Sequence, residues 1–529
     1  MRNYETDVLV VGAGPVGMAL ALDLRYRGVD FMMVEASDGS VPHPKVGTVG
    51  PRSMELFRRW GVAGEIRSAG WPADHPLDIA WVTALGGHEI HRLDFGTAAT
   101  RPELPYTPEP EQVCPQHWLS PLLARRVGVH PDGPLRRRCR AEGARQDAEG
   151  VTVTVTDLGD GTRLTVRARY VVACDGASSP LRKAARIAAP ARHATQVYRN
   201  ILFRAPGLRE LLGDRGALVH FLTQPGALRF PLRSMDGREL YRLTAGGSQV
   251  LDGEALDLVR SAIAFDIPLT IVSENVWYLT HRVAETYRDG RLLLAGDAAH
   301  TLSPSGGFGM NTGIVDAADL GWKLAGELAG WAGPGLLDAY DTERRPVAMR
   351  SLEEANANLV RTVRRELPEE ITQDTPQGAR ARAELSAALE RSPVRREFAA
   401  PDVHFGYRYD SPLIAGGAGQ AGDWRDSALP GGRAPHAWLA PGRSTLDLFG
   451  PGFHLLCGTQ AEEAGLKEFE AAFARRGVPL ETTHWDEQRA PEHCRGLCVL
   501  VRPDGHVAWR GTAPPADPGE LADTVRGAR

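Results

Sequence analysis

The sequence predicts an α/β fold, because three short apolar runs each lead into a turn built from glycine or aspartate. These turns are residues 12–17 (GAGPVG), 175–176 (DG) and 296–297 (GD). In an open α/β sheet the carboxyl ends of parallel strands line one crevice, and ligands bind there. We therefore expect the three turns, although far apart in the sequence, to face a single ligand.

The first turn lies inside a complete βαβ pattern. A strand pattern precedes it, a helical pattern follows as far as Gly28, and a second strand pattern ends at Glu35. Gly12, Gly14 and Gly17 allow the backbone to approach a pyrophosphate, and an acid about twenty residues further on accepts a hydrogen bond from a ribose hydroxyl. The turn therefore predicts a dinucleotide site.

A second match to the glycine pattern, residues 417–422 (GAGQAG), lacks this context. The residues that follow it include Pro430 and Gly431, which break a helix. We expect a loop there, which leaves one dinucleotide site.

Residues 296–311 are the most informative stretch of the chain. Gly296 and Asp297 follow a strand pattern, Pro304 precedes a glycine-rich turn, and an amphipathic helical pattern covers residues 314–328. A strand, a glycine-rich turn and a helix in this order present backbone N–H groups to a phosphate-bearing ligand. Together with the first turn, this stretch can hold a long dinucleotide from both ends, which indicates a flavin enzyme.

Length and composition are those of an ordinary globular protein. The chain has 529 residues, 43% of them hydrophobic and 24% charged, and a net charge of −5, which gives no case for binding nucleic acid. Its six cysteines contain no Cys-x-x-Cys pair, so we expect neither a disulfide framework nor a metal site. There is no apolar stretch of about eighteen residues and no signal-peptide pattern, so we expect no membrane span and a cytoplasmic location.

The turns and the strand patterns divide the first part of the chain between two domains. Residues 73–100 and 193–284 alternate short β-like runs and predict an inserted sheet that covers the ligand. The segments that carry the dinucleotide-binding turns are residues 1–72, 101–192 and 285–345.

The last part of the chain has a different pattern. Residues 346–399 are rich in Ala, Arg, Glu and Leu and predict a helical segment. Residues 400–529 begin with a Pro- and Gly-rich passage and continue with alternating strand and helix patterns, which predicts a separate small α/β domain.

The order of these motifs resembles the class A FAD-dependent aromatic hydroxylases, the family of p-hydroxybenzoate hydroxylase and phenol hydroxylase. The likeness continues through residues 316–324 (DAADLGWKL) and 340–346 (YDTERRP) and covers essentially the whole chain. Residues 501–510 (VRPDGHVAWR) are similar to the end of the longer phenol, 3-(3-hydroxyphenyl)propionate and polyketide hydroxylases. The resemblance implies a Rossmann-like FAD-binding domain with an inserted β-sheet substrate domain and a C-terminal thioredoxin-like domain.

The resemblance also implies an activity. FAD would be bound tightly but without a covalent bond, and NADPH or NADH would be a transient co-substrate. A phenolic or polyketide-like aromatic ring would be hydroxylated with O₂ through a flavin C4a-hydroperoxide, from which water must be excluded. Baeyer–Villiger or antibiotic-modifying oxygenation is an alternative, and a catalytically silent flavin-binding protein is another; a homodimer is left open.

Residue roles follow only where the motifs match. Pro304, Gly306 and Gly307 would form the wall beside the flavin atom that takes up O₂. Met310 and Asn311 would offer backbone N–H groups to the pyrimidine edge of the flavin at the start of a helix. The cofactor contacts implied by the resemblance are Gly12, Gly14, Gly17, Glu35, Ala36, Lys45, Arg52, Gln116, Asp175, Asp297, Gly309, Met310 and Asn311.

The substrate side is less clearly marked. His220, Arg233 and Tyr241 lie on or near predicted strands of the inserted sheet and are the substrate-binding candidates. Gly47 stands where phenol hydroxylase-like members have an aspartate that could deprotonate the phenol, so the base is unassigned. Asp319 replaces the family's commoner asparagine, and we expect this change to lie on a helix surface.

Overall fold

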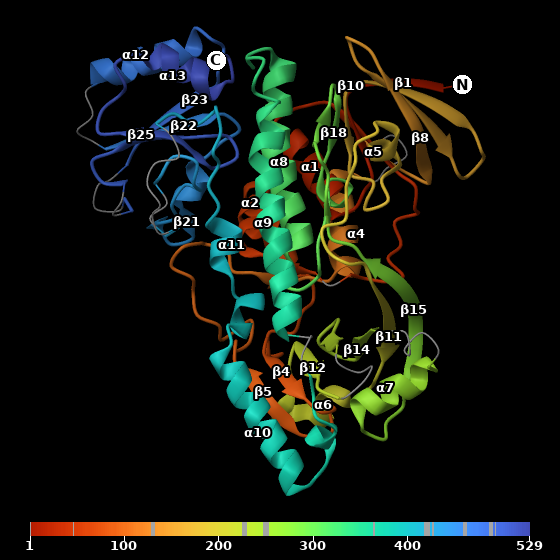
Figure 1. The fold of residues 1–529 in the computed structure, drawn as a ribbon. Coiled ribbons are helices and arrows are strands. Elements are labelled where there is room, and N and C mark those ends of the chain that lie inside the picture. Colours follow the sequence, from red (N-terminus) through yellow and green to blue (C-terminus); the bar gives the residue numbers. More distant parts are fainter. Residues whose placement is uncertain are drawn as a thin grey trace.

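The computed structural model describes residues 2–45, 47–128, 133–224, 230–246, 253–362, 366–416, 424–425, 428–458, 463–485, 490–491 and 494–529. The second glycine-pattern match, residues 417–422, lies outside these residues. Two large sheets, a smaller C-terminal sheet and the helices around them make up the described part of the chain (Figure 1).

The first sheet confirms the predicted α/β fold. Its strand order is β17-β18-β10-β1-β2-β7, and β10, β1, β2 and β18 run parallel. The register places Val11 beside Ala173 and Ala173 beside Leu294, so the three turns predicted from the sequence begin side by side at one edge. The strands are β1 (Arg2–Val11), β2 (Phe31–Glu35), β7 (Leu135–Arg137), β8 (Cys139–Gln146), β9 (Val151–Asp157), β10 (Arg163–Ala173), β17 (Arg288–Asp289) and β18 (Leu292–Leu294).

Helices α1 (Pro15–Tyr26) and α8 (Phe308–Ala329) follow two of these turns and pack against each other. Their close approach depends on small residues, since a Cβ at Gly313 would lie 2.5 Å from Val16 and one at Gly321 would lie 2.1 Å from Asp23. The other elements of this domain are β3 (Thr48–Val49), α2 (Pro51–Arg59), α3 (Ala63–Arg67), β6 (Gln112–Val113), α4 (Gln116–Val127), α5 (Pro180–Ala184), β16 (Arg282–Val283), η3 (Gly296–Ala298) and β19 (His300–Thr301).

The second sheet joins strands from two separate stretches of the chain, in the order β15-β11-β14-β13-β12-β4-β5. One face packs on α7 around Phe203, Leu243 and Val259. The opposite face turns toward the edge of the first sheet where the three turns lie. The elements are β4 (Ile79–Val82), β5 (Glu89–Leu93), β11 (Gln196–Arg204), α6 (Leu208–Leu212), η1 (Gly213–Arg215), β12 (Val219–Leu222), β13 (Pro231–Ser234), β14 (Leu240–Gly246), α7 (Ala255–Ile263) and β15 (Thr270–Leu279).

A helical link connects the sheets to the C-terminal part. Helix α10 lies along β5, at the end of the molecule far from the C-terminal sheet (Figure 1). No helix in the described residues is long and apolar enough to cross a membrane. The link consists of α9 (Ala339–Thr362), η4 (Glu369–Thr372), α10 (Pro376–Arg391), η5 (Val394–Glu397) and α11 (Pro401–Phe405).

The C-terminal sheet has the order β23-β22-β24-β25, in which β22 and β23 are parallel and the other pairs antiparallel. A βαβ unit followed by a hairpin in this order supports the expected thioredoxin-like description. The elements are β20 (Trp438–Ala440), β21 (Arg443–Ser444), η6 (Thr445–Leu448), β22 (Phe453–Gly458), α12 (Glu463–Ala474), β23 (Leu480–Trp485), β24 (Cys498–Val501), β25 (Val507–Gly511) and α13 (Pro518–Val525).

A buried ionic cluster ties this domain to α8 and α9. Arg502 donates hydrogen bonds to Glu343 at 2.6 Å and to Asp319 at 3.1 Å, and Lys323 contacts Glu343 at 2.6 Å and Asp319 at 2.5 Å. All of these side chains are fully buried. The expectation that Asp319 lies on a helix surface is therefore wrong, because the C-terminal domain covers that face of α8 and Asp319 contacts Lys323 and Arg502 there.

Candidate active site

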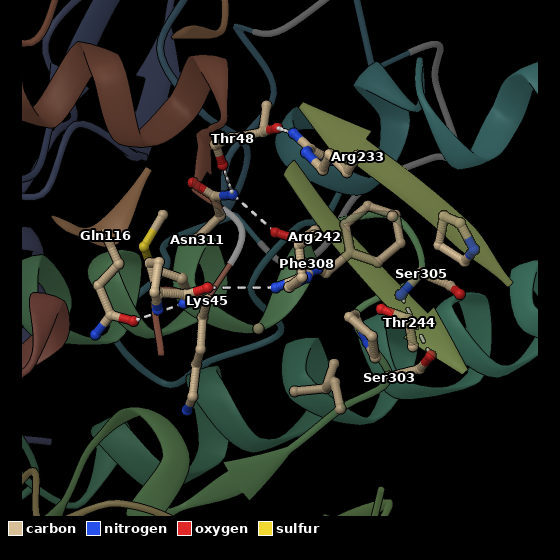
Figure 2. Close-up of a pocket in the computed structure, with 18 of the residues that line it drawn as sticks. Lys45, Thr48, Gln116, Arg233, Arg242, Thr244, Ser303, Ser305, Phe308 and Asn311 are labelled. Atoms are coloured by element: carbon tan, nitrogen blue, oxygen red, sulfur yellow. Dashed lines mark hydrogen bonds between the residues drawn. The ribbon is translucent and has the colours of Figure 1, made fainter. Parts of the chain in front are cut away.

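A cavity of about 670 Å³ lies where the two large sheets meet. This volume is in the range of small-molecule binding sites. Its wall is formed by the three turns of the first sheet, by one face of the second sheet and by residues of the helical link, so chain segments far apart in sequence share it. Figure 2 shows Lys45 and Gln116 on one side of the view, and Arg233, Arg242 and Thr244 on the other.

The first turn is shaped by two glycines that leave no room for a side chain. A Cβ at Gly12 would lie 2.4 Å from the carbonyl oxygen of Cys174, and one at Gly17 would lie 2.0 Å from that of Gly12. Gly14 differs, because a Cβ there would meet nothing within 4 Å. Gly14 also caps α1 without a side-chain hydrogen bond, so the first amides of this helix are directed to the cavity wall with no capping side chain. This open helix N-terminus fits a phosphate group.

Glu35 fixes the shape of the same turn. Its Oε2 accepts a hydrogen bond of 2.7 Å from the amide of Ala13, and its Oε1 accepts one of 2.7 Å from Ser37. Ala36 follows directly and is exposed. The carboxylate at the end of β2 thus lies against the glycine turn, where the resemblance places the adenosine ribose.

Lys45, Gln116 and Asp297 come together on the rim of the cavity. The backbone amide of Lys45 donates to Oε1 of Gln116 at 3.2 Å, and its ammonium group lies 3.4 Å from Asp297. The Lys45 side chain is 79% exposed, so little protein competes with a ligand for its charge. All three residues line the cavity.

The segment from Pro304 to Asn311 forms the neighbouring wall. Gly306 and Gly307 have φ angles of 96° and 65°, and a Cβ at Gly306 would overlap the ring of Phe308. Gly307 caps α8 without a side-chain hydrogen bond, and Gly309 and Met310 in the first turn of that helix line the cavity. The segment therefore presents a smooth wall and a second open helix N-terminus.

The side chain of Asn311 holds this segment in place. Its Oδ1 accepts hydrogen bonds of 2.7 Å from the amide of Gly50 and from the hydroxyl of Ser53. Its Nδ2 donates to the carbonyl oxygens of Thr48 and Gly307 at 3.0 and 2.8 Å. Because the amide side chain has all four of its hydrogen bonds within the protein, only the backbone of Asn311 is left to meet a ligand.

Six of the expected cofactor contacts do not line the cavity: Gly12, Gly17, Glu35, Ala36, Arg52 and Asp175. Gly12, Gly17, Glu35 and Ala36 belong to the first turn or follow the strand beside it, whereas Arg52 and Asp175 have partners elsewhere. Arg52 is buried on the other side of α2, where it donates to Glu55 at 2.9 Å and to the carbonyl oxygen of Asp504 at 2.8 Å. Asp175 turns toward α5 and accepts a hydrogen bond of 3.2 Å from the amide of Leu181. Arg52 thus connects α2 to the C-terminal domain, and Asp175 connects the second turn to the helix that follows it.

The alternation of side chains along the inserted strands decides which substrate candidates reach the cavity. Val219, Phe221, Arg233, Arg242 and Thr244 point into it.

His220 and Tyr241 occupy the alternate positions, on the opposite face of the sheet. His220 Nε2 lies 3.2 Å from the carbonyl oxygen of Arg215, and the Tyr241 hydroxyl donates to that of Arg238 at 3.0 Å. Of the three substrate candidates, the structure brings only Arg233 to the cavity. The expectation for His220 and Tyr241 assumed the wrong face of the sheet.

Arg242 was not predicted from the sequence as a site residue. It lies directly opposite Arg233 in the register of β13 and β14. Burial, together with the charge of Arg242, lowers the pKa of Arg233 to about 9, and burial lowers that of Arg242 to about 10. Their guanidinium groups donate to neutral atoms, the hydroxyl of Thr48 at 2.8 Å and the carbonyl oxygen of Pro44 at 3.4 Å. The pair forms a cationic end of the cavity.

Glu111, a carboxyl whose charge raises the pKa of Arg233, itself has a shifted pKa. Burial raises its pKa, and the charges of Arg101 and Arg233 counteract that effect only in part. The Nε of Arg242 has no hydrogen-bond partner among the described residues. The cationic end is therefore not neutralised by the protein alone.

Comparison with known proteins agrees with this geometry. Residues 5–355 match a family described as an FAD binding domain, and residues 427–528 match the C-terminal domain of aromatic-ring hydroxylases. The chain is 32% identical to the tetracenomycin B2 monooxygenase-dioxygenase of Streptomyces olivaceus, over 99% of this chain and 98% of that protein. It is 30% identical to the 2,4-dichlorophenol 6-monooxygenase of Cupriavidus pinatubonensis, over 99% and 96% of the two chains.

Solved structures extend the likeness to the whole architecture. The chain is 58% identical to the rebeccamycin biosynthetic enzyme RebC in a structure soaked with chromopyrrolic acid and containing 7-carboxy-K252c, with a TM-score of 0.95 and full coverage of both chains. It is 28% identical to aklavinone-11 hydroxylase in its ternary complex with FAD and aklavinone, with a TM-score of 0.82 and full coverage of both chains. These findings confirm the expected FAD cofactor and the monooxygenase class, for which NAD(P)H is the usual reductant. The chain belongs to the FAD-dependent aromatic-ring hydroxylases, a family of flavin monooxygenases.

Proposed function

We propose that this monooxygenase acts on a polycyclic aromatic compound that carries a carboxylate. The observation that carries the proposal is the pair Arg233 and Arg242, opposite each other on neighbouring strands at one end of the cavity. Like charges in directly opposite positions of a sheet repel each other, and their burial adds a desolvation cost. A ligand carboxylate offsets both costs, because guanidinium groups bind carboxylates with paired, charge-assisted hydrogen bonds.

The other end of the cavity fits FAD. The open N-termini of α1 and α8, at Gly14 and Gly307, would take the pyrophosphate and the pyrimidine edge of the flavin. The ribityl chain of FAD, which joins the pyrophosphate to the flavin, would be contacted by Lys45, Gln116 and Asp297. When bound, FAD supplies the electron-accepting and oxygen-activating chemistry that amino-acid side chains lack. The wall beside the reactive part of FAD is formed by Pro304, Gly306 and Gly307. These residues have no bulky side chains, so a substrate can approach the flavin closely.

Between the two ends the lining is aromatic and aliphatic. Tyr198 stacks on Trp277 with ring centroids 5.0 Å apart, and Phe221 and Phe230 lie in the same wall. Flat apolar walls bind the faces of a polycyclic ring and exclude water from it. We infer that the ring system lies across this lining, with its carboxylate at Arg233 and Arg242 and its reacting carbon toward Pro304.

Solved structures of RebC, which is 58% identical to this chain, support this class of ligand. RebC was soaked with chromopyrrolic acid and holds 7-carboxy-K252c in one structure, and was soaked with K252c in another. The remaining expectations, that O₂ is the oxidant and that the protein works in the cytoplasm, belong to the same proposal, and a homodimer is left open.

A comparison of two ligands tests the carboxylate assignment. We expect the FAD-loaded protein to bind 7-carboxy-K252c about 10- to 100-fold more tightly than K252c, as hydrogen bonds between charged groups provide. The Arg242→Gln variant should lose most of this preference, whereas the exposed Arg238→Gln on the same hairpin should keep it. Dissociation constants from fluorescence titration measure the effect, and equal affinities of the unmodified protein for the two ligands would overturn the assignment.

The same preparation tests the activity. A carboxylated aromatic substrate should accelerate NAD(P)H consumption and yield a product that has gained one oxygen atom, as read by mass spectrometry. Flavin oxidation that never transfers oxygen to any carboxylated aromatic compound would contradict the proposed reaction.

A further inference from the structure

Glu397 places a buried carboxyl group at the cavity, although the helical link that carries it gave no sign of a site. It is the last residue of η5, it lines the cavity, and only 7% of it is exposed. The side chain of Ser305 lies close enough to lower the pKa of the Glu397 carboxyl. Because Ser305 lies between Pro304 and Gly306, the carboxyl reaches the cavity beside the wall that we assign to the reactive part of the flavin.

A hydroxyl group next to Glu397 can form a hydrogen bond with its carboxyl in both the protonated and the ionised state. The Oγ1 of Thr362 contacts Oε2 of Glu397 and lies 2.7 Å from the carbonyl oxygen of Asn358. A hydroxyl has one hydrogen to donate and two lone pairs to accept. When Glu397 is protonated it donates to Thr362, which donates to Asn358; when Glu397 is ionised, Thr362 turns its hydrogen toward the carboxylate.

The charges around Glu397 leave it poised near neutral pH. Burial raises the pKa of Glu397 to about 7, although the hydroxyl groups of Thr362 and Ser305 and the charge of Arg361 lower it. Arg361 is engaged elsewhere, since it donates to Glu354 at 3.1 Å and to Asn358 at 2.7 Å.

Other titratable side chains lie on the elements around this site. His404 of α11 lines the cavity, and burial lowers its pKa to about 4, so it is neutral at pH 7. Arg396, beside Glu397 in the chain, points away from the cavity and is held by Glu354 and Asp402. The other carboxyls of the cavity lining, Glu111 and Asp297, lie beside the cations Arg233 and Lys45.

The position that carries an acid in phenol hydroxylase-like members cannot do so here. A Cβ at Gly47 would lie 2.3 Å from the carbonyl oxygen of Cys114 and 2.9 Å from Pro115, both backbone atoms. An aspartate at this position therefore requires a different backbone, and the role of the base is vacant on that side of the cavity.

We propose that Glu397 is the catalytic base, which takes the proton from the O–H or N–H group on the ring that is hydroxylated. The O–H or N–H bond breaks, its electron pair stays with the aromatic system, and the proton passes to Glu397. The ring becomes more electron-rich, as attack on an electrophilic oxygen requires. This assignment rests on the proposed function, because it needs an aromatic substrate with such a group next to Pro304.

The pH dependence of product formation tests this assignment, with chromopyrrolic acid as the probe. In the FAD-loaded protein kcat/KM should fall as the pH is lowered through about 7, because a protonated Glu397 cannot accept a proton. Glu397→Gln should form product about 10²- to 10⁴-fold more slowly and lose this acid limb, and Glu397→Asp should restore part of both. FAD content and ligand-stimulated NAD(P)H oxidation should stay within about twofold, and the exposed Glu390→Gln of α10 is the matched control.

An infrared titration makes the test independent of the substrate. In the difference between the spectra of FAD-loaded wild-type protein and Glu397→Gln, a protonated-carboxyl band should be present at low pH and disappear as the pH rises through about 7. Taking the difference removes the bands of Asp319 and Glu111, whose pKa values burial also raises. If wild-type protein shows this band but transfers no oxygen to any aromatic probe, the proposed function fails. The raised pKa of Glu397 would then be confirmed, but its role as a catalytic base would not. If oxygen transfer proceeds and Glu397→Gln retains the rate and the acid limb, or if the band is absent, the assignment of Glu397 is overturned.

Discussion

The two ends of the cavity are built by different means. The cofactor end is built on backbone, in strand-end turns and in helix N-termini at Gly14 and Gly307 that carry no capping side chain, with the side chains of Lys45, Gln116 and Asp297 on its rim. The substrate end is made of side chains, the pair Arg233 and Arg242 from adjacent strands and Glu397 from a short turn. A backbone-built site demands glycines at fixed spacing, whereas a side-chain-built site constrains only which residue faces the cavity. The first kind leaves a motif in the sequence and the second does not.

The largest effect should come from filling the glycine turn of the cofactor end. In Gly17→Val the new Cβ lies 2.0 Å from the carbonyl oxygen of Gly12, so the turn cannot keep its shape. We expect the purified variant to lose its FAD, with an affinity at least about 100-fold weaker, as measured by flavin absorbance after gel filtration.

Gly14→Ala sharpens the same comparison. A Cβ there meets nothing within 4 Å in the protein, so the FAD-free variant should melt at the wild-type temperature and still bind FAD more weakly, because the methyl group faces the cofactor. Full FAD content in Gly17→Val, or a lowered melting temperature of FAD-free Gly14→Ala, would contradict a cofactor end built in this way.

A smaller effect is expected at the substrate end, on stability. The pKa of Glu397 is raised by burial from 4.5 to about 7, so between these values the folded protein holds a proton that the unfolded chain has lost. Its contribution therefore favours folding less as the pH rises from about 4.5 to 7, by up to about 3 kcal/mol in total. Glu397→Gln lacks this dependence, so it should gain stability over wild type between pH 5 and 8.

Urea unfolding of both proteins at the two pH values measures that gain. The difference between the proteins cancels the other titrating groups, which they share. A gain that is the same at pH 5 and pH 8 would show that Glu397 is ionised throughout, and would remove the support that its environment gives to a role as base.

The smallest effect is expected on the face of the inserted sheet that is turned away from the cavity. Tyr241→Phe removes a hydroxyl that donates to the carbonyl oxygen of Arg238. The change should cost about 1 kcal/mol of stability and leave the affinity for 7-carboxy-K252c within about twofold, by the same fluorescence titration. A tenfold loss of affinity would show that this face, too, contacts the ligand.

The parts of the fold that follow from local pattern were predictable. Parallel pairing places Val11, Ala173 and Leu294 at one edge, so three separate turns could be assigned to one ligand before any contact was known. Gly12 and Gly17 could be assigned because only glycine fits where another backbone segment passes within contact distance.

The substrate end could not be predicted, because it depends on register and on long-range packing. Arg233 was found but Arg242 was missed, since their pairing depends on how β13 and β14 align. Arg52 and Asp319 were misplaced because the covering C-terminal domain, and not the local pattern, decides what their helices face. Glu397 could not be predicted as a site residue, because only the packing of the helical link against the sheets brings η5 to the cavity.

A crystal structure of the protein with FAD and 7-carboxy-K252c tests the central claim most directly, because it shows both ends of the cavity at once. We expect the ligand carboxylate to lie within hydrogen-bond distance of Arg233 and Arg242, with the flavin ring along the segment from Pro304 to Asn311. A carboxylate that points to solvent or to Lys45, with the two arginines unengaged, would contradict the division of the cavity into a backbone-built cofactor end and a side-chain-built substrate end.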